Sequence, residues 1–277
     1  MSKWGNIFFR EGEDFRAGAV FVVDKPLRWT SFDVVNKVRI CLRKGYGKIK
    51  VGHAGTLDPL ASGVVIICVG KETKKIEEYM GQEKEYVAEI TFGHTTPSYD
   101  LETSFDEEFS YEHVDRSCLE RAIEQFVGEI EQFPPSYSAV RVDGVRAYEK
   151  ARRGDEVEMK SRKVMVREIE QFPPSYSAVR VDGVRAYEMA RRGDEVEMKS
   201  RKVMVREIEI LKVELPIVEL RIVCSKGTYI RSLAHDLGKA CGSGSHLSAL
   251  RRTRVGDFRV EDGFKMDEII GVLQENL

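Results

Sequence analysis

The 277-residue chain lacks the features that mark several large classes of protein. No apolar run approaches the ~18 residues of a membrane-spanning helix, so we expect no membrane partner. The N-terminal stretch MSKWGNIFFREGEDF mixes charges with apolar residues and contains no signal-peptide core. These absences predict a cytoplasmic protein.

Metal and cofactor motifs are missing as well. The five cysteines are scattered, with no CxxC pair and no histidine at metal-ligand spacing. Reduced and mostly buried thiols are their ordinary interpretation. No nucleotide-binding glycine loop is visible. We therefore predict no metal and no cofactor. The cysteines are Cys41, Cys68, Cys118, Cys224 and Cys241.

A strong charge of one sign is also absent, since the formal net charge is −2. This argues against a protein coated with nucleic-acid contacts, although a local basic face is compatible with a neutral total. Hydrophobic residues make up 42% of the chain and charged residues 32%, which is enough apolar mass for a substantial core. The composition is that of an ordinary globular protein.

An internal tandem copy is the most conspicuous feature that is present. The segment Glu129–Arg167 recurs 39 residues later as Glu168–Arg206, with a single difference, Lys150 against Met189. A solenoid normally needs three or more repeats, and those repeats drift apart on their exposed faces. A recent or artificial duplication fits better, and one copy is then surplus to the fold.

Apolar periodicity predicts a mixed set of elements. Ala19–Asp24 is a short strand, and Thr30-Ser31 offers an N-cap for a helix over Phe32–Leu42. Arg43–Lys50 is predicted as a basic loop, and Gly52–Gly63 is too rich in glycine and proline for regular structure. Further helices are expected at Lys71–Met80, Arg116–Val127, around Ile230–Leu237 and at Phe264–Leu277, and strands at Val64–Val69, Glu85–Phe92, Ile208–Val213 and Val218–Cys224.

These elements do not follow a strict βαβ rhythm. They favour an α+β fold with a mixed, mostly antiparallel central sheet flanked by helices over a doubly wound sheet. We expect residues 1–277 to form a single catalytic domain.

The loop GHAGTLDPLASG (Gly52–Gly63) carries the clearest chemical signal. Three glycines let backbone approach a ligand closely, and Pro59 biases Asp58 towards an extended conformation. Residue types alone leave two interpretations open. Asp58 is either a catalytic carboxylate or the cap of a structural turn.

This loop resembles the catalytic loop of the TruB family of tRNA pseudouridine synthases. DKPLRWTSFDVVNKV (Asp24–Val38) and Lys84-Glu85-Tyr86 with its strand are similar to two further family motifs. KGTYIRSLAHDLG (Lys226–Gly238), GSHLSALRRTRVG (Gly244–Gly256) and the duplicated PPSYSAVRVDGVRAYE also match. The resemblance runs in order from about Val20 to Gly256.

The resemblance implies the pseudouridine synthase fold and isomerisation of the T-arm uridine at position 55 of tRNA. Asp58 would be the catalytic carboxylate, as nucleophile or base, and Arg231 would pair with it and lower its pKa. Tyr86 would stack on the flipped uracil and Leu250 would pack on its other side. The alternatives are a surface helix position for Arg231 and a core position for Tyr86.

Three more residues take roles from the same resemblance. His53 would fill the space that the extruded nucleotide leaves, or is an ordinary hydrogen-bonded loop histidine. Lys25 would contact phosphate or support the catalytic loop. Asp100, in TTPSYDLE, would help to position the substrate RNA. Two basic groups are candidates for phosphate contacts: Arg141, Arg146, Arg152 and Arg153, and Arg251, Arg252 and Arg254.

Two departures from the family pattern stand out. Only a short helix follows Gly256, so we expect a short form without the C-terminal RNA-binding PUA domain, acting as a monomer on the T-arm stem-loop. The duplication lies in a region with which members of the family surround the bound RNA. An RNA-binding or tRNA-folding protein with impaired catalysis is therefore the alternative function. A guide-dependent synthase and a small-molecule isomerase are disfavoured, because the former relies on the missing domain and the latter needs motifs that are not visible.

Overall fold

The computed structural model describes residues 14–127 and 201–275 and, between them, the short strands Arg141–Val142, Val145–Arg146, Ile169–Gln171, Arg180–Val181 and Val184–Arg185. Most of the duplicated sequence, including the basic group from Arg141 to Arg153, therefore has side chains outside the described residues. The chain forms two compact units. The first comprises Met1–Tyr86 and Leu250–Leu277, and the second comprises Val87–Ala249.

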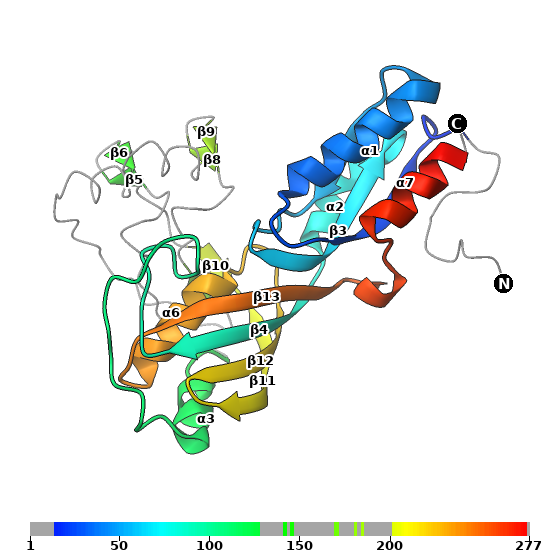
Figure 1. Cartoon of the computed structure of the whole chain (residues 1–277). Helices are drawn as coiled ribbons and strands as arrows, with labels where there is room; N and C mark the ends of the chain where they lie inside the picture. The colour runs from blue at the N-terminus through cyan, green and yellow to red at the C-terminus, as the bar shows by residue number, and fades with distance from the viewer. Residues whose placement is uncertain are drawn as a thin grey trace. The chain divides into compact units, whose positions relative to one another are not determined.

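An eight-stranded mixed sheet, with helices around it, gives the α+β class that the sequence predicted (Figure 1). Its strand order is β1-β3-β13-β4-β12-β11, with β2 also on β3 and β14 also on β13. β3 pairs antiparallel with β1 and parallel with β13. The strands are β1 (Ala19–Lys25), β2 (Val51–Ala54), β3 (Ala61–Val69), β4 (Lys84–Phe92), β11 (Val205–Glu214), β12 (Ile217–Cys224), β13 (Ser245–Val255) and β14 (Phe258–Arg259).

The helices among the described residues follow the predicted positions closely. The segment expected as one helix at Lys71–Met80 begins as a 3₁₀ turn and continues as α2. The α-helices are α1 (Ser31–Tyr46), α2 (Ile76–Gly81), α3 (Arg116–Glu124), α6 (Ile230–Ala240) and α7 (Met266–Glu275), with 3₁₀ turns η1 (Gly70–Lys75) and η2 (Val260–Asp262).

Helix α1 begins at a capping box. The Thr30 side chain accepts a hydrogen bond from the Asp33 amide, and the Asp33 carboxylate accepts one from the Thr30 amide. The helix runs to Tyr46, so the predicted loop from Arg43 onwards is wrong there. Arg43 and Lys44 occupy its last turn, where positive charge favours the helix C-terminus. The apolar residues that recur at helical spacing along α1 are buried, namely Val34, Val35, Val38, Cys41 and Leu42.

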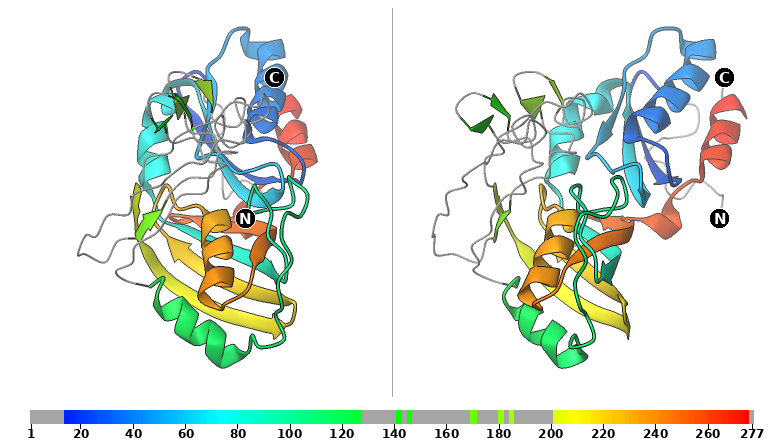
Figure 2. Two further views of the ribbon diagram at one scale, coloured as in Figure 1. Left: turned by 90° about the vertical axis from the view of Figure 1, so that its left-hand side faces the viewer. Right: turned by 60° about the vertical axis from the view of Figure 1, so that its left-hand side comes forward.

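The core of the first unit lies on β3. Every residue from Gly63 to Val69 is buried, because helices and strands cover both faces of this strand. On one face Val64, Ile66 and Cys68 pack with Val20 and Val22, under side chains that include Ile76 of α2. α7 contacts both α1 and β1, and α1 and α7 lie side by side (Figure 2).

The glycine-rich loop is more regular than predicted. Gly52–Ala54 belong to β2, where Gly52 pairs with Cys68, and β3 begins at Ala61. Gly63 has φ 106°, and a Cβ there would meet the carbonyl oxygen of Arg252 at 2.2 Å. Because β13 approaches so closely, this position requires glycine. Only residues 55–60 remain outside the strands.

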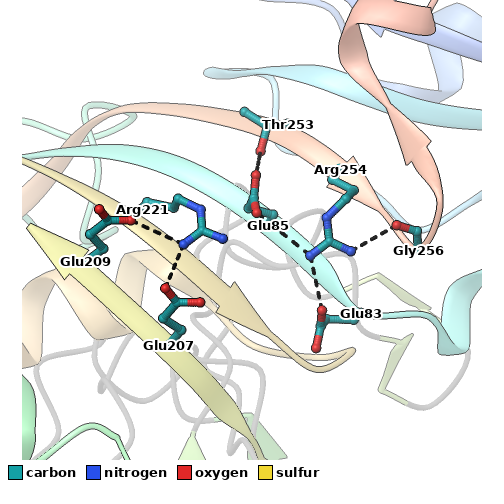
Figure 3. Close-up of polar contacts among 8 residues, drawn as sticks. All are labelled: Glu83, Glu85, Glu207, Glu209, Arg221, Thr253, Arg254 and Gly256. Carbon is teal, nitrogen blue, oxygen red and sulfur yellow. Dashed lines mark hydrogen bonds and ion pairs between the residues drawn. The ribbon is translucent and has the colours of Figure 1, made fainter. Parts of the chain in front are cut away.

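The part of the eight-stranded sheet that lies in the second unit has one polar and one apolar side. On β12, Val218, Leu220 and Ile222 are buried. On the opposite side Arg221 donates to Glu207 at 2.8 Å and to Glu209 at 3.2 Å (Figure 3). Helix α6 buries Ile230, Leu233, Ala234 and Leu237, as its periodicity predicted, and contacts α3. The alternation of strand side chains explains this division.

Candidate active site

The catalytic-loop candidate, Asp58, is held by hydrogen bonds on both sides. Ser31 binds Leu57 twice, since its hydroxyl accepts from the Leu57 amide at 2.8 Å and donates to the Leu57 carbonyl at 3.1 Å. The Arg28 amide donates to the Pro59 carbonyl at 2.7 Å. Asp58 itself is half-buried. The first residue of α1 and the turn before it thus fix both neighbours of the carboxylate, which is the preorganisation that a reacting group needs.

Arg252 supports the start of the same loop. Its side chain is buried, and its guanidinium donates to the carbonyls of Val64 at 2.7 Å, Gly55 at 3.1 Å and Thr56 at 3.4 Å. The prediction that this residue contacts phosphate is wrong, because the side chain has no access to a ligand. The sequence analysis missed this structural role. A signal was present, because Arg252 lies two residues after Leu250 on β13, so both side chains point to the same, buried face of the strand.

The two neighbouring arginines of that group are ion-paired. Arg251 lies 2.8 Å from Asp24, with 42% of its side chain exposed, and Arg254 lies 3.1 Å from Glu83. A phosphate contact by Arg251 or Arg254 stays a prediction. For Arg251, a phosphate would have to displace Asp24 from the ion pair, and partly exposed ion pairs of this kind are weak.

Lys25 is fully buried at the end of β1. Its ammonium donates to the carbonyls of Trp29 at 2.6 Å and Pro26 at 3.0 Å. Burial lowers the pKa of Lys25 to about 8, and the nearby Asp58 carboxylate opposes this shift. Of the two predicted roles, direct phosphate contact is therefore wrong, since solvent does not reach the side chain. Its hydrogen bonds to Pro26 and Trp29 agree with the other predicted role, support of the loop that carries Asp58, which stays a prediction.

The predicted base-contacting residues of the first unit lie on adjacent strands. Tyr86 is on β4 and Leu250 is on β13, and both are buried, at 8% and 9% exposure. Leu250 pairs with Ala61, whose amide donates to the Asp58 carbonyl at 3.1 Å. Leu250 is thus next to the loop that carries Asp58. His53 is half-buried on β2, opposite Ile67.

Polar contacts tie the beginning of β4 to the end of β13. Thr253 donates to Glu85 at 2.9 Å, and Arg254 lies 3.1 Å from Glu83 and 3.8 Å from Glu85 (Figure 3). These are the strands that carry Tyr86 and Leu250. The contacts fix the relative register of the two predicted base-stacking residues.

In the second unit Arg231 is buried on α6, so the alternative of a surface position is wrong. It lies 3.3 Å from the Asp100 carboxylate and donates to the Ser98 carbonyl at 3.4 Å. Asp100 also accepts from the Glu102 amide at 2.9 Å. A buried guanidinium needs such a partner. Asp100 is itself buried, and its role in positioning the RNA stays a prediction.

Tyr99, which precedes Asp100, was not singled out from the sequence. It has φ 64°, and its ring stacks on His235 of α6 with centroids 3.8 Å apart. Burial lowers the pKa of His235 to about 3, so the imidazole is neutral. The Tyr99 carbonyl accepts from the Leu247 amide at 2.9 Å. This stack anchors the loop that presents Asp100 to Arg231.

Asp58 and Arg231 belong to different units, so the ion pair expected between them stays a prediction. Across the part of the chain that the structure describes, no group of three or more histidine, cysteine or acidic side chains is arranged to hold a metal ion. In the same residues, no helix is long and apolar enough to span a membrane.

Comparison with protein-family models matches almost the whole chain. The model described as TruB family pseudouridylate synthase, N-terminal domain, matches residues 43–170 and again 165–230. The two matches meet inside the duplicated segment. The model of the tRNA pseudouridylate synthase B C-terminal domain matches residues 231–276.

Curated relatives named tRNA pseudouridine synthase B cover the chain at high identity. The protein of Phocaeicola vulgatus is 47% identical over 90% of this chain and 90% of its own length. That of Parabacteroides distasonis is 44% identical over 95% of this chain and 97% of its own length. The more distant protein of Thermobifida fusca is 40% identical over 91% of this chain and 74% of its own length.

Solved structures show the same fold. A chain of a Cbf5-Nop10-Gar1 complex matches with a TM-score of 0.60 and 27% identity, over 93% of this chain. A chain of an H/ACA RNP bound to a substrate RNA containing 2'-deoxyuridine matches with a TM-score of 0.57 and 25% identity, also over 93% of this chain. This chain spans about half of each, 54% and 53%. With its family models, its relatives and its fold in agreement, the chain belongs to the TruB family of pseudouridylate synthases, isomerases that act on tRNA.

Proposed function

We propose that the enzyme isomerises uridine 55 in the T-arm of tRNA, with the target base flipped out of the RNA and Asp58 as the catalytic carboxylate. The reaction breaks the bond between ribose and base, rotates the base and rejoins it through carbon. It consumes no electrons and no outside energy. The observation that carries the proposal is the clamped position of Asp58, between Leu57 bound to Ser31 and Pro59 bound to Arg28.

The neighbouring groups suit a carboxylate that must stay ionised. The Lys25 ammonium interacts electrostatically with the Asp58 carboxylate. From the family resemblance Arg231 is the proposed second cation, and within its own unit Asp100 lies 3.3 Å from it. Positive charge near a carboxylate favours its ionised form, which either a nucleophilic or a basic role requires. We also expect the enzyme to act as a monomer in the cytoplasm, where tRNA is found.

Position 55 is tested by mapping pseudouridine in a tRNA transcript after single-turnover incubation. We expect one modified site, at uridine 55, and none in a transcript in which cytidine replaces that uridine. An isolated T-arm stem-loop should also be a substrate. Modification of a different uridine, or of several, would contradict the T-arm assignment without affecting the family assignment.

Tyr86 provides a second test of the proposed base-flipping site. Tyr86→Phe should retain turnover because the ring still stacks, whereas Tyr86→Leu should weaken the productive complex by roughly 1–3 kcal/mol, the range for one base–aromatic stack. The comparison uses kcat/KM on the T-arm stem-loop, with thermal unfolding as the folding control. If both variants match the parent, Tyr86 is only a core residue.

Deletion of one repeat tests the alternative of a tRNA-binding protein with impaired catalysis. Removing residues Glu129–Arg167 leaves a full copy joined to β11. Closing a longer loop costs little more than closing a short one, so the surplus copy should be tolerated. We expect the shortened chain to fold and to keep or exceed the parent's activity. An inactive parent beside an active deletion variant would support the alternative. Failure of the shortened chain to fold would mean that both copies are part of the structure.

A further inference from the structure

A hollow of about 350 Å³ lies on the surface of the first unit, between the turn that follows β1 and the outer side of α1. Four of its residues repeat at helical spacing along α1, so they form one stripe of that helix. The other two come from the turn. The hollow is lined by Arg28, Trp29, Asp33, Asn36, Lys37 and Ile40. None of these residues belongs to the catalytic loop.

The electrostatic character of the hollow is positive. Arg28 and Lys37 are exposed, and neither forms an ion pair with any residue of the ranges 14–127 and 201–275. The one acidic group, Asp33, is engaged by its helix cap, since it accepts from the Thr30 amide at 2.8 Å and from the Thr30 hydroxyl at 2.7 Å. With one negative charge on Asp33 against two positive charges on Arg28 and Lys37, the lining carries a net positive charge, which favours an anionic ligand.

The backbone at Arg28 is strained. Its φ of 67° is a conformation that glycine adopts freely and that a residue with a Cβ adopts rarely. The hydrogen bond from its amide to Pro59 at 2.7 Å holds it there. An arginine at a position that suits glycine destabilises the fold. Strained residues of this kind are found most often at functional sites, which points to a functional role for the Arg28 side chain.

Beside the two cations lies an aromatic surface. Trp29 is half-buried, which leaves part of its indole exposed, and Asn36 offers an amide that both donates and accepts hydrogen bonds. Looped RNA is recognised by this combination: cations meet phosphates, and unstacked bases lie on aromatic side chains.

We propose that this hollow is a second RNA-binding site, which takes one unpaired nucleotide of the tRNA loop, with its phosphate at Arg28 and Lys37 and its base on Trp29. The inference rests on the proposed T-arm loop as substrate, but it is independent of the role of Asp58. The turn that contains Arg28 and Trp29 connects the hollow to the loop that carries Asp58. The Trp29 carbonyl accepts a hydrogen bond from Lys25 at 2.6 Å, and the Arg28 amide donates one to the Pro59 carbonyl. A nucleotide in the hollow therefore also braces the catalytic loop.

Binding is measured in an Asp58→Asn background, so that turnover does not change the RNA. Arg28→Gly and Lys37→Gln should each weaken affinity for the T-arm stem-loop several-fold, and each should lower the slope of log Kd against log salt by about one. Trp29→Leu should weaken affinity roughly tenfold, at low and high salt alike. The matched control is Lys44→Gln, an exposed cation of the same helix outside the hollow, which should leave affinity unchanged.

Two further measurements separate binding from folding. Arg28→Gly should raise the Tm because glycine relieves the strain, even as RNA affinity falls. The chain has two tryptophans, so Trp4→Phe leaves Trp29 as the only one, and the T-arm stem-loop should quench its fluorescence. Unchanged RNA affinity in all three hollow variants would overturn the proposal, as would an equal loss in Lys44→Gln. Turnover by Asp58→Asn would refute the proposed catalytic role, and the binding comparison would then use a stem-loop in which cytidine replaces the target uridine.

Discussion

We expect Asp58→Asn to abolish pseudouridine formation and to leave RNA affinity and thermal unfolding nearly unchanged. The asparagine side chain keeps the shape and most of the hydrogen bonding of aspartate, but it lacks the anionic oxygen that attacks or accepts a proton. The loop geometry persists because the hydrogen bonds that hold it come from Ser31 and Arg28 to the residues on either side. The loss should appear entirely in kcat.

The measurement is single-turnover pseudouridine formation in a T-arm stem-loop, beside the binding affinity for the same RNA. Asp257→Asn is the matched control, because Asp257 is an exposed aspartate of the first unit outside the site, and it should behave like the parent. Residual turnover within ~10-fold of the parent would show that the chemistry lies elsewhere.

We expect Arg252→Met to destabilise the protein by roughly 2–5 kcal/mol, because a buried polar group left without its hydrogen bond costs about 1–3 kcal/mol and Arg252 donates to several carbonyls. Methionine fills much of the volume but leaves the carbonyls of Val64 and Gly55 without their donors. Each buried carbonyl that loses its hydrogen bond costs stability. Because Gly55 and Thr56 begin the catalytic loop, turnover at a permissive temperature should fall as well.

Chemical denaturation measures this loss, and the adjacent Arg251→Met is its control. Arg251 is 42% exposed and pairs with Asp24, so its replacement should cost less than about 1 kcal/mol. Arg252→Lys keeps a charge but loses the planar fork, and it should fall between the two. If Arg252→Met instead left stability intact and weakened RNA binding, the structural role assigned here would be wrong.

Sequence alone determined the family and most of the helices and strands, but not β2 or β13. The cap at Thr30, the apolar spacing along α1 and α6, and the buried run in β3 were all visible, because each depends on residues a few positions apart. The motif around Asp58 also identified the family, since its residues are contiguous. Helix ends were less well predicted, as at Tyr46, where the end depends on a single glycine cap.

Only the tertiary structure decided what each charged residue does. Arg252 and Arg251 are neighbours in sequence, yet one is buried among carbonyls and the other is exposed. Lys25 is buried by a turn, and Arg231 finds Asp100 from a position far away in the chain. Burial and pairing arise from contacts between distant segments, so the pattern of residues along a single strand or helix does not contain them.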